Sequence, residues 1–184
     1  MEVNNNKKTV PKRQDVSAGN ISSKELVVAL GASTGGTEAL ADVIMGFRAD
    51  IPGTIVTQHM PPGFTKMFAE RLNNQCAVRV KEAQTGDQIV QGQVLIAPGD
   101  KHLRLVRNGE HFQVECKKGE RVSGHCPSVD VLFESVAKVA GKNALGIGVG
   151  LALVLGEALA GVALSSPSVL TRNVFPSDSR RNTS

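Results

Sequence analysis

The sequence has no tyrosine and no tryptophan, so its only large aromatic residues are six phenylalanines. Proteins that hold single-stranded nucleic acid stack the bases on aromatic rings, so the composition argues against that class. The formal net charge of the 184 residues is +4. The excess of basic residues falls in 1–24 and 171–184, which leaves the stretch between them close to neutral. The positive charge therefore does not indicate a nucleic-acid partner.

Cysteines are also few. There are three, an odd number without a C-x-x-C pair, at Cys76, Cys116 and Cys126. This usage is typical of reduced thiols in a cytoplasmic protein. A zinc site formed by His125 with Cys126 and Cys116 is conceivable, but the four histidines lack metal-ligand spacing and loop positions are the simpler interpretation. We expect no metal and no other cofactor.

Long apolar runs are missing. The longest one, 144–155, is too short and too rich in glycine to span a bilayer. The first residues are polar and lack the apolar core of a signal peptide. Asn, Lys, Ser, Gly and Pro dominate residues 1–24, which predicts a flexible basic linker. The sequence thus predicts a cytoplasmic protein without membrane insertion.

Residues 25–150 alternate apolar runs typical of buried strands with segments of helical periodicity. The expected strands are 26–30, 54–58, 79–83, 94–97 and a last one from 144, and the expected helices are 37–45, 64–72 and 128–140. The β-α-β-α order predicts an α/β fold with a mostly parallel sheet. Asn108-Gly109 lies between two alternating stretches and predicts an antiparallel hairpin insertion.

Two chemically active side chains follow the first two expected strands. Gly31 to Gly35 reads G-x-S-x-G, a pattern typical of a serine nucleophile on a tight strand-to-helix turn. His59 follows the second strand. The carboxyl ends of parallel strands lie at one edge of a sheet, so Ser33 and His59 can meet there, and a Ser–His pair is the minimum for an activated serine.

Two other interpretations stay open at this point. Ser33 can simply cap a helix while His59 ends a strand. Alternatively, the small-residue turn at Ser33 can bind a phosphate group at the helix N-terminus. It lacks the G-x-G-x-x-G order of a dinucleotide site, and the position after the second strand holds His59 rather than an acid.

Four segments in this order closely resemble the CheB family, the chemotaxis protein-glutamate methylesterases. They are Gly31–Ala39, Thr57–Phe64, Ile96–Asp100 with His102, and Pro127–Phe133. The resemblance covers about residues 26–146. It implies a doubly wound α/β catalytic domain over 25–150 that hydrolyses glutamate methyl esters on chemoreceptors and deamidates glutamines there.

The resemblance also implies roles for single residues. Ser33 matches the family's nucleophile and His59 its general base. Thr34 follows the nucleophile, so its backbone N–H is the expected oxyanion donor. Asp100 and Asp130 belong to the motifs but match no catalytic role, so helix capping or loop structure is the expected function of both.

The sequence departs from the family after Gly146. The G-M-G-x-D-G segment with the triad's acid is absent, and Leu155 stands where the acid is expected. Glu157 fits only with a two-residue insertion, and Asp178 lies in a polar tail. We therefore expect 151–184 to be a divergent segment, poorly ordered at its end, for which a frame change in the coding sequence is one hypothesis.

Two further departures concern regulation and substrate contact. Cys126 stands where the family usually has arginine, and no upstream receiver domain is expected in this chain. Because the acid orients the histidine, two functions remain: an esterase with an incomplete triad, or a catalytically impaired fragment that only binds receptor tails. An α/β phosphate-binding domain is the weaker third alternative.

Overall fold

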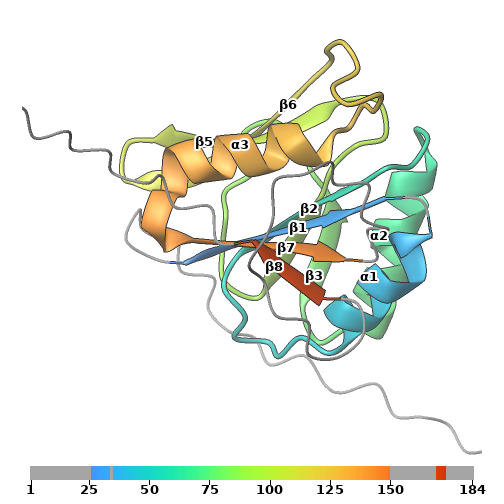
Figure 1. Ribbon diagram of the computed structural model, residues 1–184. Coiled ribbons are helices and arrows are strands. Elements are labelled where there is room, and N and C mark those ends of the chain that lie inside the picture. Colours follow the sequence, from blue (N-terminus) through green and yellow to red (C-terminus); the bar gives the residue numbers. More distant parts are fainter. Residues whose placement is uncertain (1–25, 34, 150–168, 173–184) are drawn as a thin grey trace, which may run out of the picture.

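A computed structural model describes residues 26–33 and 35–149, together with the backbone of 169–172 (Figure 1). The helices are α1 (Gly36–Met45), α2 (Phe64–Gln75) and α3 (Val129–Ala140), followed by a short 3-10 turn at Gly141–Asn143. The strands are β1 (Val27–Ala32), β2 (Thr54–Gln58), β3 (Arg79–Glu82), β4 (Gln93–Ile96), β5 (His102–Asn108), β6 (His111–Lys117), β7 (Ala144–Val149) and β8 (Val169–Arg172).

Six strands form one sheet in the order β3-β4-β2-β1-β7-β8. All neighbouring pairs are parallel except β7 with β8. The central strand β1 is buried over its whole length, as expected for a strand with neighbours on both edges and layers on both faces. Its register with β2 pairs Ala32 with Gln58, so the residues that follow both strands emerge side by side.

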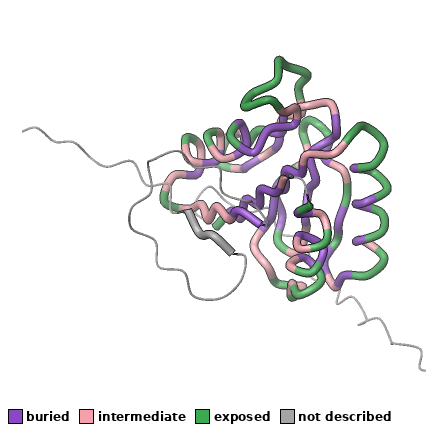
Figure 2. Tube along the Cα trace, turned by 45° about the vertical axis from the view of Figure 1, so that its right-hand side comes forward, coloured by how far each residue is buried: buried purple, intermediate pink, exposed green. Residues whose placement is uncertain are grey.

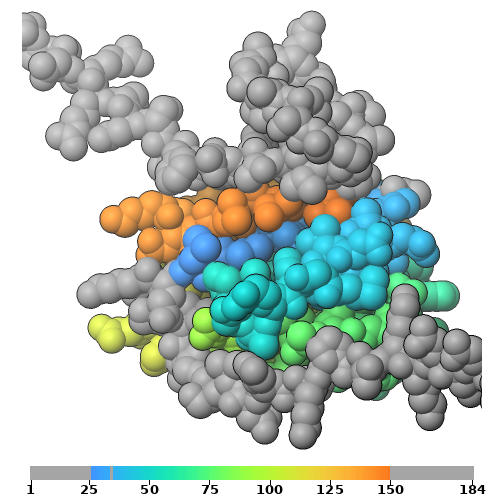
Figure 3. Space-filling model, turned by 90° about the horizontal axis from the view of Figure 1, so that it is seen from below, coloured from blue at the N-terminus to red at the C-terminus, as the bar shows by residue number. Residues whose placement is uncertain are grey.

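Successive residues of β1 point to opposite faces of the sheet, and each face has its own core. Val28 and Leu30 pack with apolar residues of α1 and α2 on one face. Val27 and Ala29 pack with residues of α3 and the β5–β6 hairpin on the other. Helices α1 and α2 turn their buried sides to the sheet (Figure 2), and Figure 3 shows α1 in light blue on the outer surface.

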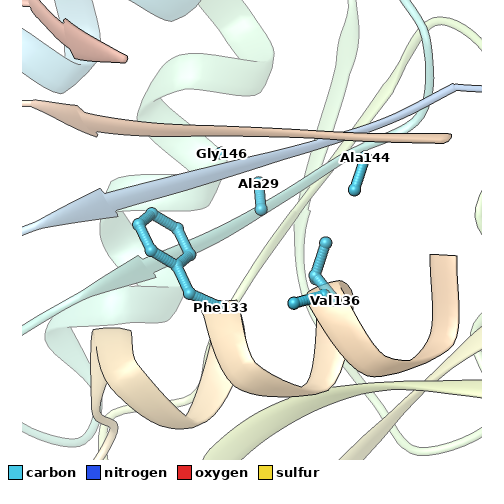
Figure 4. Close-up of a pocket in the computed structure, with 6 residues that line it drawn as sticks. Ala29, Phe133, Val136, Ala144 and Gly146 are labelled. Atoms are coloured by element: carbon cyan, nitrogen blue, oxygen red, sulfur yellow. The ribbon is translucent and has the colours of Figure 1, made fainter. Parts of the chain in front are cut away.

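Helix α3 lies close to the sheet because small residues line β1 and β7 beneath it. Phe133 and Val136 point from α3 toward Ala29 and Ala144 (Figure 4). The gap that remains there is about 10 Å³, room for one water molecule at most, so it is no substrate site. The backbone of β1 lies very close to α3 at Gly31, since a side-chain carbon there would overlap Val129.

The expected fold class is confirmed: helices cover both faces of a mostly parallel sheet, and β5 and β6 form the antiparallel hairpin. The hairpin closes over Gly109 and Glu110, with Asn108 paired to His111, one residue later than Asn108-Gly109 suggests. Helix α2 runs three residues longer than expected, to Gln75. Strand β8 is an addition that the sequence analysis did not predict.

We expect Gly31→Ala to lower the free energy of unfolding by about 1–3 kcal/mol, because the added carbon overpacks the contact of β1 with Val129 of α3. Urea denaturation monitored by far-UV circular dichroism measures this change. Gly46→Ala is the matched control, since its added carbon would meet only ordinary contacts of 3.4 Å or more. Equal stability of the two variants would contradict the packing argument.

Candidate functional site

Ser33 and His59 lie side by side at the carboxyl edge of the sheet. Each follows the last residue of its strand, and the register of Ala32 with Gln58 brings them together. The backbone N–H of His59 donates to the carbonyl of Ala32 at 3.3 Å, which continues the pairing one step past the strands. The side chains then meet, with 3.2 Å between His59 Nδ1 and Ser33 Oγ.

The turn after β1 changes direction within a few residues. The backbone N–H of Gly36 donates to the carbonyl of Ser33 at 2.8 Å, and Gly35 has φ 81°, a conformation that glycine adopts without a steric penalty. A side-chain carbon at Gly36 would come within 2.9 Å of Ala32 Cβ. Small residues are therefore needed for α1 to start directly behind Ser33.

Gln58 holds the backbone of both residues. Its side chain is 1% exposed, and its Nε2 donates to the carbonyl of Ser33 at 3.0 Å and to that of His59 at 3.5 Å. A buried amide with two such contacts restrains the two strand ends relative to each other. Gln58 was not predicted from the sequence, because its role depends on its buried position at the end of β2.

His59 also contacts a second histidine. Its ring stacks on that of His125, with 3.7 Å between ring centroids and 11° between planes. Burial lowers the pKa of His59, and His125 lowers it further, while Asp130 opposes them. Protonation of His59 is therefore disfavoured, and the ring is held in the neutral form that a general base needs. Nothing in the sequence predicted this contact.

The nitrogen of His59 that faces away from the serine, Nε2, is buried. It has no hydrogen-bond partner among the described residues. Since Nδ1 faces Ser33, Nε2 is the atom left for a carboxylate. Thr34 and Glu157, the expected oxyanion donor and candidate acid, both lie outside the described residues.

The other residues of the motifs have structural contacts. Asp130 accepts a hydrogen bond from Ser123 at 2.5 Å in the first turn of α3, and Asp100 pairs with Lys118 at 3.2 Å. His102 is 2% exposed; its Nδ1 accepts from the backbone of Ser128 and its Nε2 contacts the carbonyl of Glu120. Neither of these contacts of the two aspartates caps a helix; each joins its segment to a neighbouring loop or strand end.

A solvent-open hollow lies at the carboxyl ends of β2, β3 and β4. Its lining includes neither Ser33 nor His59 and consists of Pro62, Gly63, Glu82–Thr85, Pro98–Lys101 and Cys116. Burial is the main cause that raises the pKa of Cys116 to about 11, so its sulfur is protonated at neutral pH and is no nucleophile. Across the described ranges, no three His, Cys, Asp or Glu side chains gather closely enough to hold a metal ion.

Comparison with protein families shows which family this chain belongs to. The family model described as CheB methylesterase matches residues 28–149. The chain belongs to the CheB methylesterase family. The match ends three residues after Gly146, where the expected motif with the acid fails to appear.

The names of curated relatives also include a methylesterase. The chain is 58% identical over 121 residues to protein-glutamate methylesterase/protein-glutamine glutaminase 2 of Syntrophomonas wolfei, covering 66% of this chain and 36% of that protein. It is 53% identical over 130 residues to the protein of that name from Salmonella typhimurium, covering 71% and 37%. The chain thus spans little more than a third of the length of these relatives.

A solved structure supports the fold. The Thermotoga maritima CheB methylesterase catalytic domain matches with a TM-score of 0.64 and 34% identity, over 66% of this chain and 65% of that one. The expected resemblance is thereby confirmed. Among the described residues, no helix is long and apolar enough to cross a membrane.

We expect Gln58→Glu to lower the free energy of unfolding by about 3 kcal/mol at neutral pH, because a buried carboxylate then faces the carbonyl of Ser33. The buried carboxyl would have a raised pKa, so this loss is smallest below the unfolded value of about 4.3, grows as the pH rises above it, and is complete only above the raised pKa of the folded state. Urea denaturation at neutral and acidic pH measures both effects.

Gln91→Glu provides the matched control. The Nε2 of Gln91 also donates to a backbone carbonyl, that of Asp50 at 2.9 Å, but at an exposed position. We expect a change within about 0.5 kcal/mol there. If the two glutamate variants lose stability equally, burial of Gln58 is not what restrains the strand ends.

Proposed function

We propose that the chain is the catalytic part of a protein-glutamate methylesterase, which hydrolyses glutamate methyl esters on chemoreceptors and deamidates glutamines at such sites. The observation that carries the proposal is the 3.2 Å contact of His59 Nδ1 with Ser33 Oγ. A phosphate-binding turn does not require a neutral histidine against its serine. The proposed substrate places the chain in the cytoplasm, where its three cysteines would remain reduced.

In this proposal Ser33 is the nucleophile and His59 the general base. As Ser33 Oγ attacks the ester carbonyl carbon, His59 Nδ1 takes its proton, and the carbonyl oxygen becomes an oxyanion facing the backbone N–H of Thr34. Collapse of the tetrahedral intermediate breaks the bond to the methoxy group, which leaves as methanol with the proton from His59. Water then attacks the acyl carbon and gives a proton to His59. The bond between that carbon and Ser33 Oγ breaks, Oγ takes the proton back from His59, and the glutamate is released.

The third member of a serine-hydrolase triad is a carboxylate that orients the histidine. Glu157 is the residue that we propose for it, with His59 Nε2 as the atom that it would contact. Loss of the acid's function costs about 10⁴ in kcat in serine hydrolases. Glu157→Gln, measured beside Asp178→Asn, tests the assignment: equal rates for both variants would remove Glu157 from the site.

The second candidate function is binding of receptor tails without hydrolysis. It is favoured by the departure from the family after Gly146, since a base without its acid loses most of its rate. Binding of a methylated receptor segment, measured by calorimetry, without release of methanol would support this function over the esterase.

We expect the chain to release methanol from methylated receptor in membrane vesicles, and Ser33→Ala to reduce the rate to that of vesicles alone, because no other hydroxyl contacts His59 among the described residues. Gas chromatography of the methanol measures this. Ser135→Ala is the control, since its hydroxyl contacts only Leu105 and Leu132, away from the site. Methanol release that survives Ser33→Ala would reject the proposed nucleophile.

A further inference from the structure

We propose that His125 is a positioning residue for His59: its ring is the surface against which the general base is held with Nδ1 toward Ser33. The inference rests on the proposed function for the role of His59. The stack itself, with 3.7 Å between centroids and 11° between planes, is independent of that function.

The segment that carries His125 is built to hold the ring in place. Val122 and His125 exchange two backbone hydrogen bonds of 3.0 Å. The two residues between them have positive φ, 51° for Ser123 and 80° for Gly124, which is the geometry of a tight two-residue hairpin. The hydroxyl of Ser123 also donates to Asp130 in α3. The turn is thereby fastened to the helix that packs on β1.

The stack restricts the orientation of His59. The ring of His125 against one face of the imidazole restrains the plane of the His59 ring. The contact of Nδ1 with Ser33 Oγ then fixes the position of the ring within that plane. A tilt of the His59 ring out of this plane would carry its edge into the ring of His125. The ring of His125 therefore orients the base from outside the Ser–His pair. In serine hydrolases a carboxylate usually has this function.

The stack also affects the charge of His59. The titratable groups that act on it are His125, whose proton would repel a second one, and Asp130, which favours the protonated ring. Burial and His125 outweigh Asp130, so the pKa of His59 is lowered. Because the base must be neutral to accept a proton, the site should keep its activity to a lower pH than a free imidazole would.

Titration of His59 tests the stack without any substrate. The ring nitrogen and carbon signals, followed by NMR from pH 4 to 9, should give a pKa for His59 below 6.5 in the unaltered chain. We expect it to rise in His125→Phe, which keeps a flat ring but removes the charge, and to rise further in His125→Ala, which also opens the site to water. His111→Phe at the hairpin turn is the control and should leave the pKa of His59 unchanged.

The rate of methanol release by the His125 variants then shows whether the ring acts by positioning His59. His125→Phe should keep kcat within about threefold, while His125→Ala should lower it about 10–100-fold with KM little changed, because the base loses its alignment. The acid limb of the pH–rate profile should move to higher pH in the order of the titrations. If His125→Ala does not fold, His125→Gln, a polar residue without a ring, replaces it.

The outcomes distinguish this inference from the proposed function. An unchanged His59 titration in all His125 variants overturns the positioning role, whatever the esterase activity. Equal losses of kcat in His125→Phe and His125→Ala overturn it as well, because a flat ring at position 125 would then not be what orients His59. Shifted titrations in a chain that releases no methanol would support the stack and reject the esterase.

Discussion

The register of β1 with β2 is the constraint on which the rest of the site depends. The pairing of Ala32 with Gln58 decides that the next residues, Ser33 and His59, emerge as neighbours. A shift of β2 by one residue would turn its side chains to the opposite faces and move His59 away from the serine. The register is strongly specified because both faces of these strands are buried.

The packing of the sheet and the chemistry of the site are connected through the same small residues. Gly31 lets α3 lie against β1, and Gly36 lets α1 begin directly behind Ser33. Because α3 lies close, the turn before it can carry His125 onto His59. Helix α1 on one face of the sheet and the turn before α3 on the other therefore both reach the same edge of the sheet, close to His59.

The sequence was sufficient for those parts of the fold that depend on local pattern. Strand ends predicted the position of Ser33 and His59, since parallel topology places such ends together. Gln58 and His125 could not be found in this way. Gln58 matters because of which face of β2 it occupies, and His125 because a turn 66 positions along the chain folds back onto His59. Neither fact is encoded in a local periodicity or spacing.

The stack of His59 on His125 replaces one of the two effects that a Ser–His pair obtains from a triad acid. A triad carboxylate has two effects: it orients the imidazole and it stabilises the imidazolium that forms when the serine is deprotonated. A neutral aromatic ring supplies the first effect but not the second, and His125 opposes the second once it carries a proton. Asp130 is the carboxylate that favours the charged ring, yet its Oδ2 already accepts a hydrogen bond from Ser123. In the proposed reaction, His59 would therefore be an oriented, neutral base whose protonated form is weakly stabilised. The step most affected would be formation of the tetrahedral intermediate rather than binding of the ester.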